Sequence, residues 1–214
     1  MKTKLLLLSI IFLSLFTYFS YIVAKESWQQ IDFDTTVKLQ DHVSRKYDLY
    51  FSYFSLIGSA EITAGFCFIM ALLSLIRLKI WPALGWVLII PATVAEIFGK
   101  LVLFHPAPPN FLHRTLLPTG LPSFYVHTDF SYPSGHMTRT MFIATVLITL
   151  ALIRLKDDLL KFAVVCLLVG LIIIMGVTRV YLGEHWLSDV LGGALLGAGV
   201  GFLASLLILR PKLV

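Results

Sequence analysis

The chain has 214 residues, of which 58% are hydrophobic and 14% are charged. Soluble domains have about 25% charged and 45–50% apolar residues, so this composition excludes an ordinary water-soluble protein and indicates one surrounded by lipid. A membrane-spanning helix needs roughly 20 apolar residues, which leaves room for about six such helices and little else. The net charge of +5 would suit nucleic acid, but membrane proteins also place Lys and Arg at cytoplasmic helix ends, so we expect no nucleic-acid partner.

The apolar runs predict an all-α integral membrane bundle of six transmembrane helices, in a single domain over residues 1–214. The first run, at about residues 5–24, is longer than the roughly 7–15 apolar residues of a signal peptide, and we interpret it as a retained span rather than a cleaved one. Residues 25–52 mix charged and spaced apolar side chains, which is typical of an amphipathic segment on a membrane surface. The other spans are expected at about residues 54–76, 80–104, 137–153, 162–182 and 186–209.

The distribution of basic residues predicts that both termini are cytoplasmic. In this orientation the cytoplasmic segments collect an excess of Lys and Arg, which is the usual bias of membrane proteins. The basic residues on that side are Lys2, Lys4, Arg77, Lys79, Arg154, Lys156, Lys161, Arg210 and Lys212. We therefore expect a multi-pass protein of the plasma (inner) membrane, with residues 25–52 and the loop at 105–135 on the extracytoplasmic side.

Unusual polar residues at the ends of the spans gather on the extracytoplasmic side in this topology. Lys100 lies near the end of the third span and His136 begins the fourth, whereas Arg179 ends the fifth and His185 begins the sixth. Ionisable groups in or beside the hydrocarbon are costly, and they are therefore candidates for function. Side chains that only anchor a helix at the interface would not need to share one side. We therefore expect these four residues to form one site.

The segment Pro133-Ser134-Gly135-His136 is typical of a helix N-terminus that binds an anion. Ser134 is a favoured N-cap residue, and Gly135 permits close approach of the backbone. The free N–H groups of a first helical turn and the positive end of the helix dipole attract phosphate. His136 in that turn can give a proton to a leaving oxygen. An ordinary capped helix with an interfacial histidine would have the same sequence, so both interpretations of this motif stay open.

His185 and Asp189 are four residues apart and therefore share one face of a helix. A carboxylate in this position can hold one imidazole nitrogen protonated and leave the other nitrogen free as a nucleophile. Arg179 offers a planar guanidinium that matches phosphate oxygens. Lys100 offers a point charge, and Glu96 one turn earlier is a potential partner for it. A hydrogen bond that only ties the last span to its neighbours is the structural alternative for the His–Asp pair.

These residues resemble the motifs of the type-2 phosphatidic acid phosphatase (lipid phosphate phosphatase) superfamily. That family has a Lys followed at a fixed distance by Arg-Pro, then Pro-Ser-Gly-His, and finally Ser-Arg followed at fixed distances by His and Asp. The second motif is complete at residues 133–136. The third motif matches at Thr178-Arg179, His185 and Asp189, with Thr in place of Ser.

The resemblance implies metal-independent dephosphorylation of a lipid phosphate or diphosphate, without a cofactor, at the extracytoplasmic face. His185 would attack phosphorus to form a phosphohistidine, Asp189 would orient its imidazole, and His136 would protonate the leaving group. The candidate substrates are undecaprenyl diphosphate, phosphatidylglycerophosphate and phosphatidate. The residues implied to bind the phosphate oxygens are Lys100, Ser134, Gly135 and Arg179.

The first motif departs from the family pattern, because it keeps its Lys and Pro but has Ala107 where the family has an Arg. A cationic clamp on phosphate can be worth about 10³–10⁵ in rate in related chemistry. Arg114 or His105 in the same loop, or Arg139 on the fourth span, are candidates to replace the missing cation, and we expect such compensation. Without it the protein would be slow or inactive. A lipid phosphotransferase with the same site and a non-catalytic lipid-phosphate binder are the alternative functions.

Overall fold

The structure is a computed structural model that describes residues 1–117 and 129–209. Within these residues the chain is helical, and the single pairing of extended segments is an isolated bridge between Pro106 and Phe130. Two of the predicted cytoplasmic basic residues, Arg210 and Lys212, lie outside the described residues. Short 3-10 helices cover Arg45–Tyr47, Leu56–Gly58 and Asn110–Leu112. The α-helices of the described residues are α1 (Lys2–Ala24), α2 (Gln29–His42), α3 (Asp48–Ser55), α4 (Ala60–Ile76), α5 (Ile80–Val87), α6 (Ile89–Val102), α7 (Gly135–Arg154), α8 (Asp158–Tyr181) and α9 (Leu187–Ile208).

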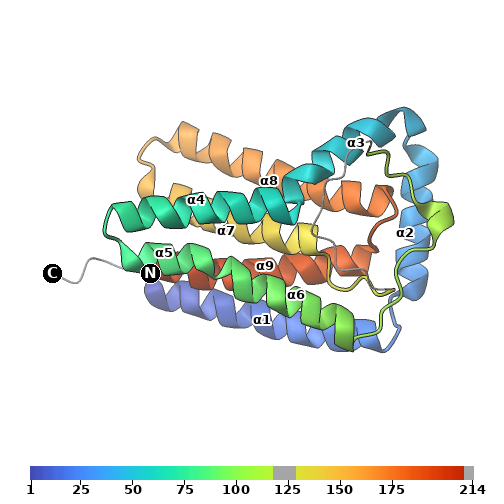
Figure 1. Cartoon of the computed structure of the whole chain (residues 1–214), viewed down its shortest axis with the longest axis horizontal. Coiled ribbons are helices and arrows are strands. Elements are labelled where there is room, and N and C mark those ends of the chain that lie inside the picture. Colours follow the sequence, from blue (N-terminus) through green and yellow to red (C-terminus); the bar gives the residue numbers. More distant parts are fainter. Residues whose placement is uncertain (118–128, 210–214) are drawn as a thin grey trace.

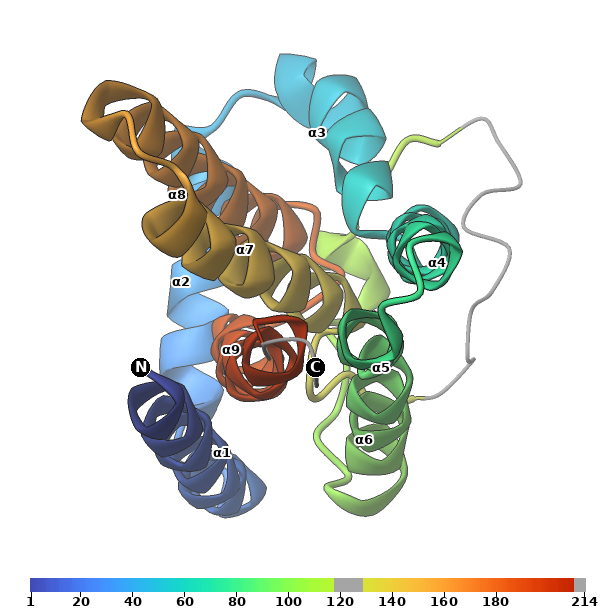
Figure 2. The same ribbon diagram turned by 90° about the vertical axis from the view of Figure 1, so that its left-hand side faces the viewer.

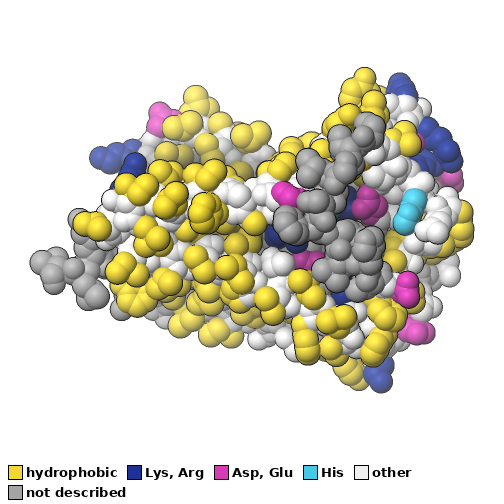
Figure 3. All heavy atoms as spheres, viewed as in Figure 1, with side chains coloured by type: hydrophobic (Ala, Val, Ile, Leu, Met, Phe, Trp, Pro, Cys, Tyr) yellow, Lys and Arg dark blue, Asp and Glu magenta, His cyan; other side chains and the backbone are white. Residues whose placement is uncertain are grey.

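Six helical stretches of the described residues are long and apolar enough to cross a membrane, which is the number expected from the sequence. The second begins at Arg45 rather than at about residue 54, because α3 and a 3-10 turn continue the helical path into α4. Hydrophobic side chains cover the flank of the bundle, and the charged side chains lie mostly toward its ends (Figure 3). The chain is therefore a multi-helical membrane protein. The six stretches are Lys2–Ala24, Arg45–Ile76, Ile80–Val102, Gly135–Arg154, Asp158–Tyr181 and Leu187–Ile208.

The last helix, α9, lies at the centre of the bundle. Viewed along the bundle, α1, α7 and the α5–α6 pair surround α9; farther out, α8 lies against α7 and α4 lies against α5 (Figure 2). A stripe of Gly193, Gly197 and Gly201 on α9 faces α7, and a Cβ atom on Gly197 would lie 2.3 Å from the carbonyl oxygen of Thr138. Small residues allow such close approach of membrane helices, and here they bring the backbones of α7 and α9 into contact.

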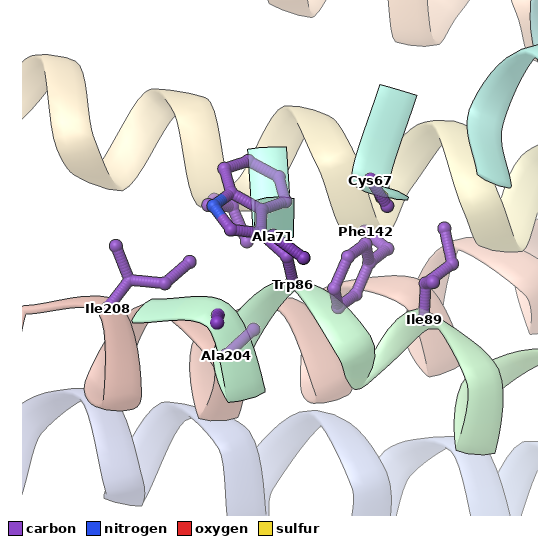
Figure 4. Close-up of a cluster of buried hydrophobic side chains, with 9 residues drawn as sticks. Cys67, Ala71, Trp86, Ile89, Phe142, Ala204 and Ile208 are labelled. Carbon is purple, nitrogen blue, oxygen red and sulfur yellow. The ribbon is translucent and has the colours of Figure 1, made fainter. Parts of the chain in front are cut away.

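A buried apolar cluster joins five helices, α4, α5, α6, α7 and α9, in the half of the bundle away from the first turns of α7 and α9. Trp86 of α5 is 2% exposed and packs with Cys67 of α4, Phe142 of α7 and Ile208 of α9 (Figure 4). The ring of Phe66 meets the Trp86 ring edge-on, with the centroids 5.7 Å apart. Lipid tails are as apolar as these side chains, so the cluster holds the helices together through close packing rather than through removal of apolar surface from water.

Two of the membrane-spanning stretches are interrupted. Pro91 has no N–H to donate to the carbonyl of Val87, and the helix breaks between α5 and α6. In the second stretch, the 3-10 turn Leu56–Gly58 separates α3 from α4. This second interruption directs the Gly58 carbonyl into the bundle, where Arg139 of α7 donates a hydrogen bond to it from Nη2 at 3.4 Å.

The helix α2 crosses the end of the bundle at which α7 and α9 begin (Figure 1). Its buried face is polar, with Asp32 and Gln40 inside, whereas Ile31 and Phe33 are exposed. Asp32 accepts hydrogen bonds from the Ser188 N–H at 2.8 Å and from the Ser188 hydroxyl at 2.7 Å. The amphipathic segment expected at residues 25–52 therefore includes a helix whose polar face is attached to the start of α9.

Candidate active site

The first turns of α7 and α9 lie side by side, held by backbone contacts. The N–H of Ser134, the residue before α7, donates to the carbonyl oxygen of Asp189 in the first turn of α9 at 2.9 Å. A Cβ atom on Gly193 would lie 2.5 Å from the carbonyl oxygen of Ser134, so glycine is required for this contact. The Pro-Ser-Gly-His segment and the His–Asp segment, which are far apart in sequence, therefore meet at one end of the bundle.

His185 and Asp189 form a buried pair at the start of α9. The imidazole Nδ1 lies 3.2 Å from the carboxylate Oδ2, which also accepts the Trp186 N–H at 2.9 Å and so caps the helix. With Nδ1 held by the carboxylate, Nε2 is the nitrogen left to react. Burial, together with the positive charges of Arg179 and Lys100, lowers the pKa of His185 well below its ordinary value of 6.5. The imidazole is therefore neutral at neutral pH, as a nucleophile must be.

Glu96 on α6 holds two cations that come from different helices. Its Oε1 lies 2.8 Å from Lys100 Nζ, and its Oε2 lies 2.9 Å from Arg139 Nη1. Gly135 makes room for this carboxylate, because a Cβ atom there would lie 2.4 Å from Glu96 Oε1. The Glu96–Lys100 pair was expected from the sequence, but the link to Arg139 was not. One carboxylate thus links cations of α6 and α7, and the charge of Glu61 on α4 also acts on Arg139.

Arg179, at the end of α8, is 2% exposed and pairs with Glu184 in the link to α9 through Nη2 and Oε2. Glu184 also accepts a hydrogen bond from the hydroxyl of Thr115. Burial raises the pKa of Glu184, but the charge of Arg179 and these hydrogen bonds outweigh burial and lower the pKa, so this carboxylate is ionised at neutral pH. Sequence analysis missed Glu184, although its place directly before His185 was a signal that could have marked it.

Several buried donors around the start of α7 have no hydrogen-bond partner among the described residues. These atoms are Ser134 Oγ, Arg139 Nε and Arg179 Nε. Ser134 was expected to cap α7, but no side-chain hydrogen bond caps this helix. The charges of Arg179, Arg139 and Lys100 all act on His136 in the first turn. Buried unpaired donors are rare in folded proteins, and their position beside an uncapped helix start and several cations suits a bound anion.

His105 contacts the carboxylate of Asp189 on the side that does not face His185. Its Nε2 lies 3.6 Å from Asp189 Oδ1 and 3.8 Å from Asp32 Oδ2, and the Ser188 hydroxyl lies 3.3 Å from the same nitrogen. Burial raises the pKa of Asp32 to about 6, even though the hydrogen bonds from Ser188 lower it. His105 therefore supports the carboxylates behind the site, and these contacts differ from the phosphate-binding role considered for it. Asp32 gave no signal in the sequence, because its partner lies at position 188.

Arg114 belongs to the loop after α6 and lies beside the end of α8, where its N–H donates to the Leu182 carbonyl. Its side chain contacts groups other than Glu96, Lys100 and Arg139. Its Nη1 donates to the Tyr181 hydroxyl at 3.2 Å and to the Val43 carbonyl at 3.4 Å, and its guanidinium lies 5.1 Å from the centroid of the Tyr181 ring. Ala107, at the position of the missing Arg, donates its N–H to the Asp129 carbonyl at 3.0 Å. Of the two arginines considered as replacements, Arg139 is the one that the structure brings together with Glu96 and Lys100.

Comparison with known proteins gives matches in sequence and in structure. The family model described as the PAP2 superfamily matches residues 83–212. An undecaprenyl-diphosphatase of Sulfolobus acidocaldarius is 33% identical over 126 residues, which cover 56% of this chain and 53% of that protein. The chain thus matches about half the length of this curated relative.

Two solved structures share the fold. The crystal structure of a transmembrane PAP2-type phosphatidylglycerolphosphate phosphatase from Bacillus subtilis has a TM-score of 0.71 at 19% identity and covers 92% of this chain and 94% of its own. The crystal structure of Aquifex aeolicus LpxE has a TM-score of 0.59 at 22% identity, with 81% and 94% covered. At these identities the likeness is evidence for the fold alone.

Proposed function

Because the chain belongs to the PAP2 superfamily, we propose that it is a membrane-embedded phosphatase that hydrolyses a lipid phosphate or diphosphate. His185 is the nucleophile, Asp189 is its orienting carboxylate and His136 is the general acid. One observation carries this proposal: a buried, neutral imidazole held by a carboxylate lies in the field of several cations, some of whose buried donors have no partner among the described residues. That arrangement suits attack on a phosphate group better than it suits a purely structural contact.

The phosphate oxygens are held by groups from three helices. Arg179 and Lys100 supply positive charge, Ser134 supplies its unpaired hydroxyl, and the N–H of Gly135 lies in the uncapped first turn of α7. Fixed donors of this kind stabilise the charge that spreads over the equatorial oxygens in the transition state. Arg139 replaces the family's missing Arg, either by a direct contact through its unpaired Nε or by keeping Glu96 from neutralising Lys100.

The reaction proceeds in two displacements. His185 Nε2 attacks phosphorus in line, the bond from phosphorus to the leaving oxygen breaks, and His136 gives that oxygen a proton. His136, now neutral, then takes a proton from water, which attacks phosphorus and breaks the bond to His185. Phosphate leaves, and both imidazoles return to their starting states. Asp189 keeps Nδ1 of His185 in its protonated form throughout.

The substrate class follows from the position of the site and from the relative that matches in sequence. The site lies at the end of the bundle where several spans begin or end, so a headgroup can reach it while its tail stays in the bilayer. The undecaprenyl-diphosphatase relative supports undecaprenyl diphosphate as the substrate. Phosphatidylglycerophosphate and phosphatidate are the other candidates. The positive-inside bias supports a plasma-membrane protein with this site on the extracytoplasmic side.

Phosphate release from a panel of these lipids in detergent tests the proposal. We expect release with excess chelator and without any added acceptor, and a loss of at least about 10⁴-fold in His185→Ala. Asp158→Asn, which removes an exposed acid at the other end of the bundle, is the matched control and keeps full activity. Binding of these lipids without release would favour the non-catalytic binder. Release only with an acceptor would favour the phosphotransferase.

A further inference from the structure

A cavity of about 920 Å³ lies at the end of the bundle opposite the candidate active site. It is bounded by the last turns of α4, α7 and α9 and by the start of α5, and Arg77, Lys79 and Arg154 line it. The helix α7 runs for 20 residues between the two ends, which at 1.5 Å per residue is about 30 Å, the thickness of the hydrocarbon layer. The cavity therefore lies level with the leaflet opposite to the catalytic one.

The three basic residues of this cavity have no acidic partner among residues 1–117 and 129–209. No Asp or Glu lines the cavity, and no acidic side chain in the described part of the chain pairs with its three basic residues. The acids nearest in sequence to Arg154 have other partners: Asp157 accepts the Leu160 N–H at 2.7 Å, and Asp158 pairs with Lys161 at 2.7 Å. Three cations at one opening without an acid between them attract an anion.

Apart from Ser74, the remainder of the lining is apolar and aromatic. Trp86 and Ile208 belong both to the cavity wall and to the buried cluster of Figure 4, and Trp81 lies in the first turn of α5. Trp side chains favour the boundary between hydrocarbon and headgroups. The cavity thus combines basic side chains with an apolar wall, which is the pattern that an amphiphile with an anionic head would match.

We propose that this cavity binds one anionic glycerophospholipid, with its phosphate among the three basic side chains and an acyl chain against the apolar wall. A zwitterionic lipid would bring its own ammonium group next to the same cations, so the site selects a net negative head. The residues that follow Leu209 are a poor occupant, because they include Arg210 and Lys212. By linking the α4–α5 turn to the ends of α7 and α9, the lipid stabilises this end of the bundle. The inference does not depend on the proposed function.

Quenching of tryptophan fluorescence by brominated lipids tests the proposal in the purified full chain. We expect brominated phosphatidylglycerol to quench at lower mole fraction than brominated phosphatidylcholine with the same acyl chains, and to raise Tm more. Each basic residue near an anionic headgroup is worth about fivefold in affinity, so Arg77→Gln with Lys79→Gln and Arg154→Gln removes most of the preference. Lys156→Gln with Lys161→Gln, which changes two basic residues of the same end outside the lining, keeps the preference.

A second variant separates binding in the cavity from general attraction to the surface. Ser74→Phe places a bulky side chain in the cavity without adding a tryptophan and leaves its three cations in place, and we expect it to lose both the preferential quenching and the gain in Tm. The Tm of each variant in lipid-free detergent shows whether it is folded. Equal quenching by the two lipids in the unmodified protein, or an unchanged preference in the triple variant or in Ser74→Phe, would overturn the proposal. So would binding that appears only after residues 210–214 are removed, because the tail would then be the occupant.

Discussion

Arg179 already has an anionic partner in the absence of substrate, because Glu184 pairs with its guanidinium. A bound phosphate has to share Arg179 with this carboxylate or displace it. We therefore expect Glu184→Gln to lower the inhibition constant of inorganic phosphate by about tenfold, which corresponds to roughly 1.4 kcal/mol of removed competition. Steady-state inhibition measures this change. An unchanged or higher constant would show that Glu184 supports phosphate binding instead of opposing it.

The replacement of the missing Arg can be assigned by comparing two arginines. Arg139 shares Glu96 with Lys100, whereas Arg114 contacts Tyr181 and Val43. We expect Arg139→Gln to reduce kcat/KM by about 10²–10³ and Arg114→Gln to have a much smaller effect. Arg139→Lys should recover part of the rate, which a variant that merely misfolds would not. If Arg114→Gln reduced kcat/KM more than Arg139→Gln, Arg114 in the loop would be the residue that replaces the missing Arg.

In the proposed mechanism, the protonation state of His185 sets the acid limb of the pH profile. Its pKa is lowered by burial and by Arg179 and Lys100, so protonation inactivates the nucleophile only at pH values below 6.5. We expect kcat/KM to show no decrease as the pH falls from 7.5 to about 6.5 and to decrease only below that. A second substrate with a different phosphate pKa distinguishes ionisation of the enzyme from that of the substrate. An acid limb above pH 7 with both substrates would contradict the assignment.

The close contact between α7 and α9 is the element-scale feature on which the site depends. A side chain at Gly197 would collide with the backbone at Thr138, whereas a Cβ atom on Gly170 of α8 would meet no described atom within 4 Å. We expect Gly197→Val to cost about 1–3 kcal/mol of stability, to lower Tm by several degrees and to reduce activity, because the first turns of the two helices move apart. Gly170→Val is the matched control. Similar losses in both variants would mean that the stripe has no special role.

Several elements could be predicted from the sequence because their signals are local. Runs of apolar residues were enough to predict the six spans. The spacing of His185 and Asp189 predicted their contact, but His185 lies in the link before α9 and not on a face of that helix. The early start of the second span was missed, because Arg45, Lys46 and Asp48 interrupt its hydropathy. The attachment of α2 was also missed, since a buried polar face depends on partners far away in the sequence.

The contacts of single side chains could be predicted from sequence spacing less often than the spans could. The expected pair of Glu96 and Lys100 is one helical turn apart and is present. Ser134 occupies the N-cap position of α7 as expected, but its hydroxyl makes no capping hydrogen bond and has no partner among the described residues. Arg139 acquires its partner Glu96 only when α6 and α7 pack together, and no spacing rule contains that information. Glu184 pairs with Arg179 only five residues before it, but across the turn after α8 rather than along a helix.

The topology of the whole molecule gives a prediction about its ends. The first helix begins and α9 ends at the same end of the bundle, opposite the candidate active site (Figure 1). With the excess of Lys and Arg at this end, we expect both termini to be cytoplasmic. A green fluorescent protein fused at either terminus should therefore fluoresce, and alkaline phosphatase fused there should be inactive. The reverse pattern would place the site on the cytoplasmic side.

The uncapped start of α7 has a consequence for the end of the catalytic cycle. Its N–H groups and the cations beside it bind the phosphate group of the substrate and the free phosphate product through the same contacts. In the proposed mechanism, the contacts that favour substrate binding therefore also slow product release. Glu184 favours product release, because its carboxylate can pair with the Arg179 guanidinium as soon as phosphate leaves. Glu184, which competes with the substrate for Arg179, would thereby also shorten the time for which the phosphate product stays bound.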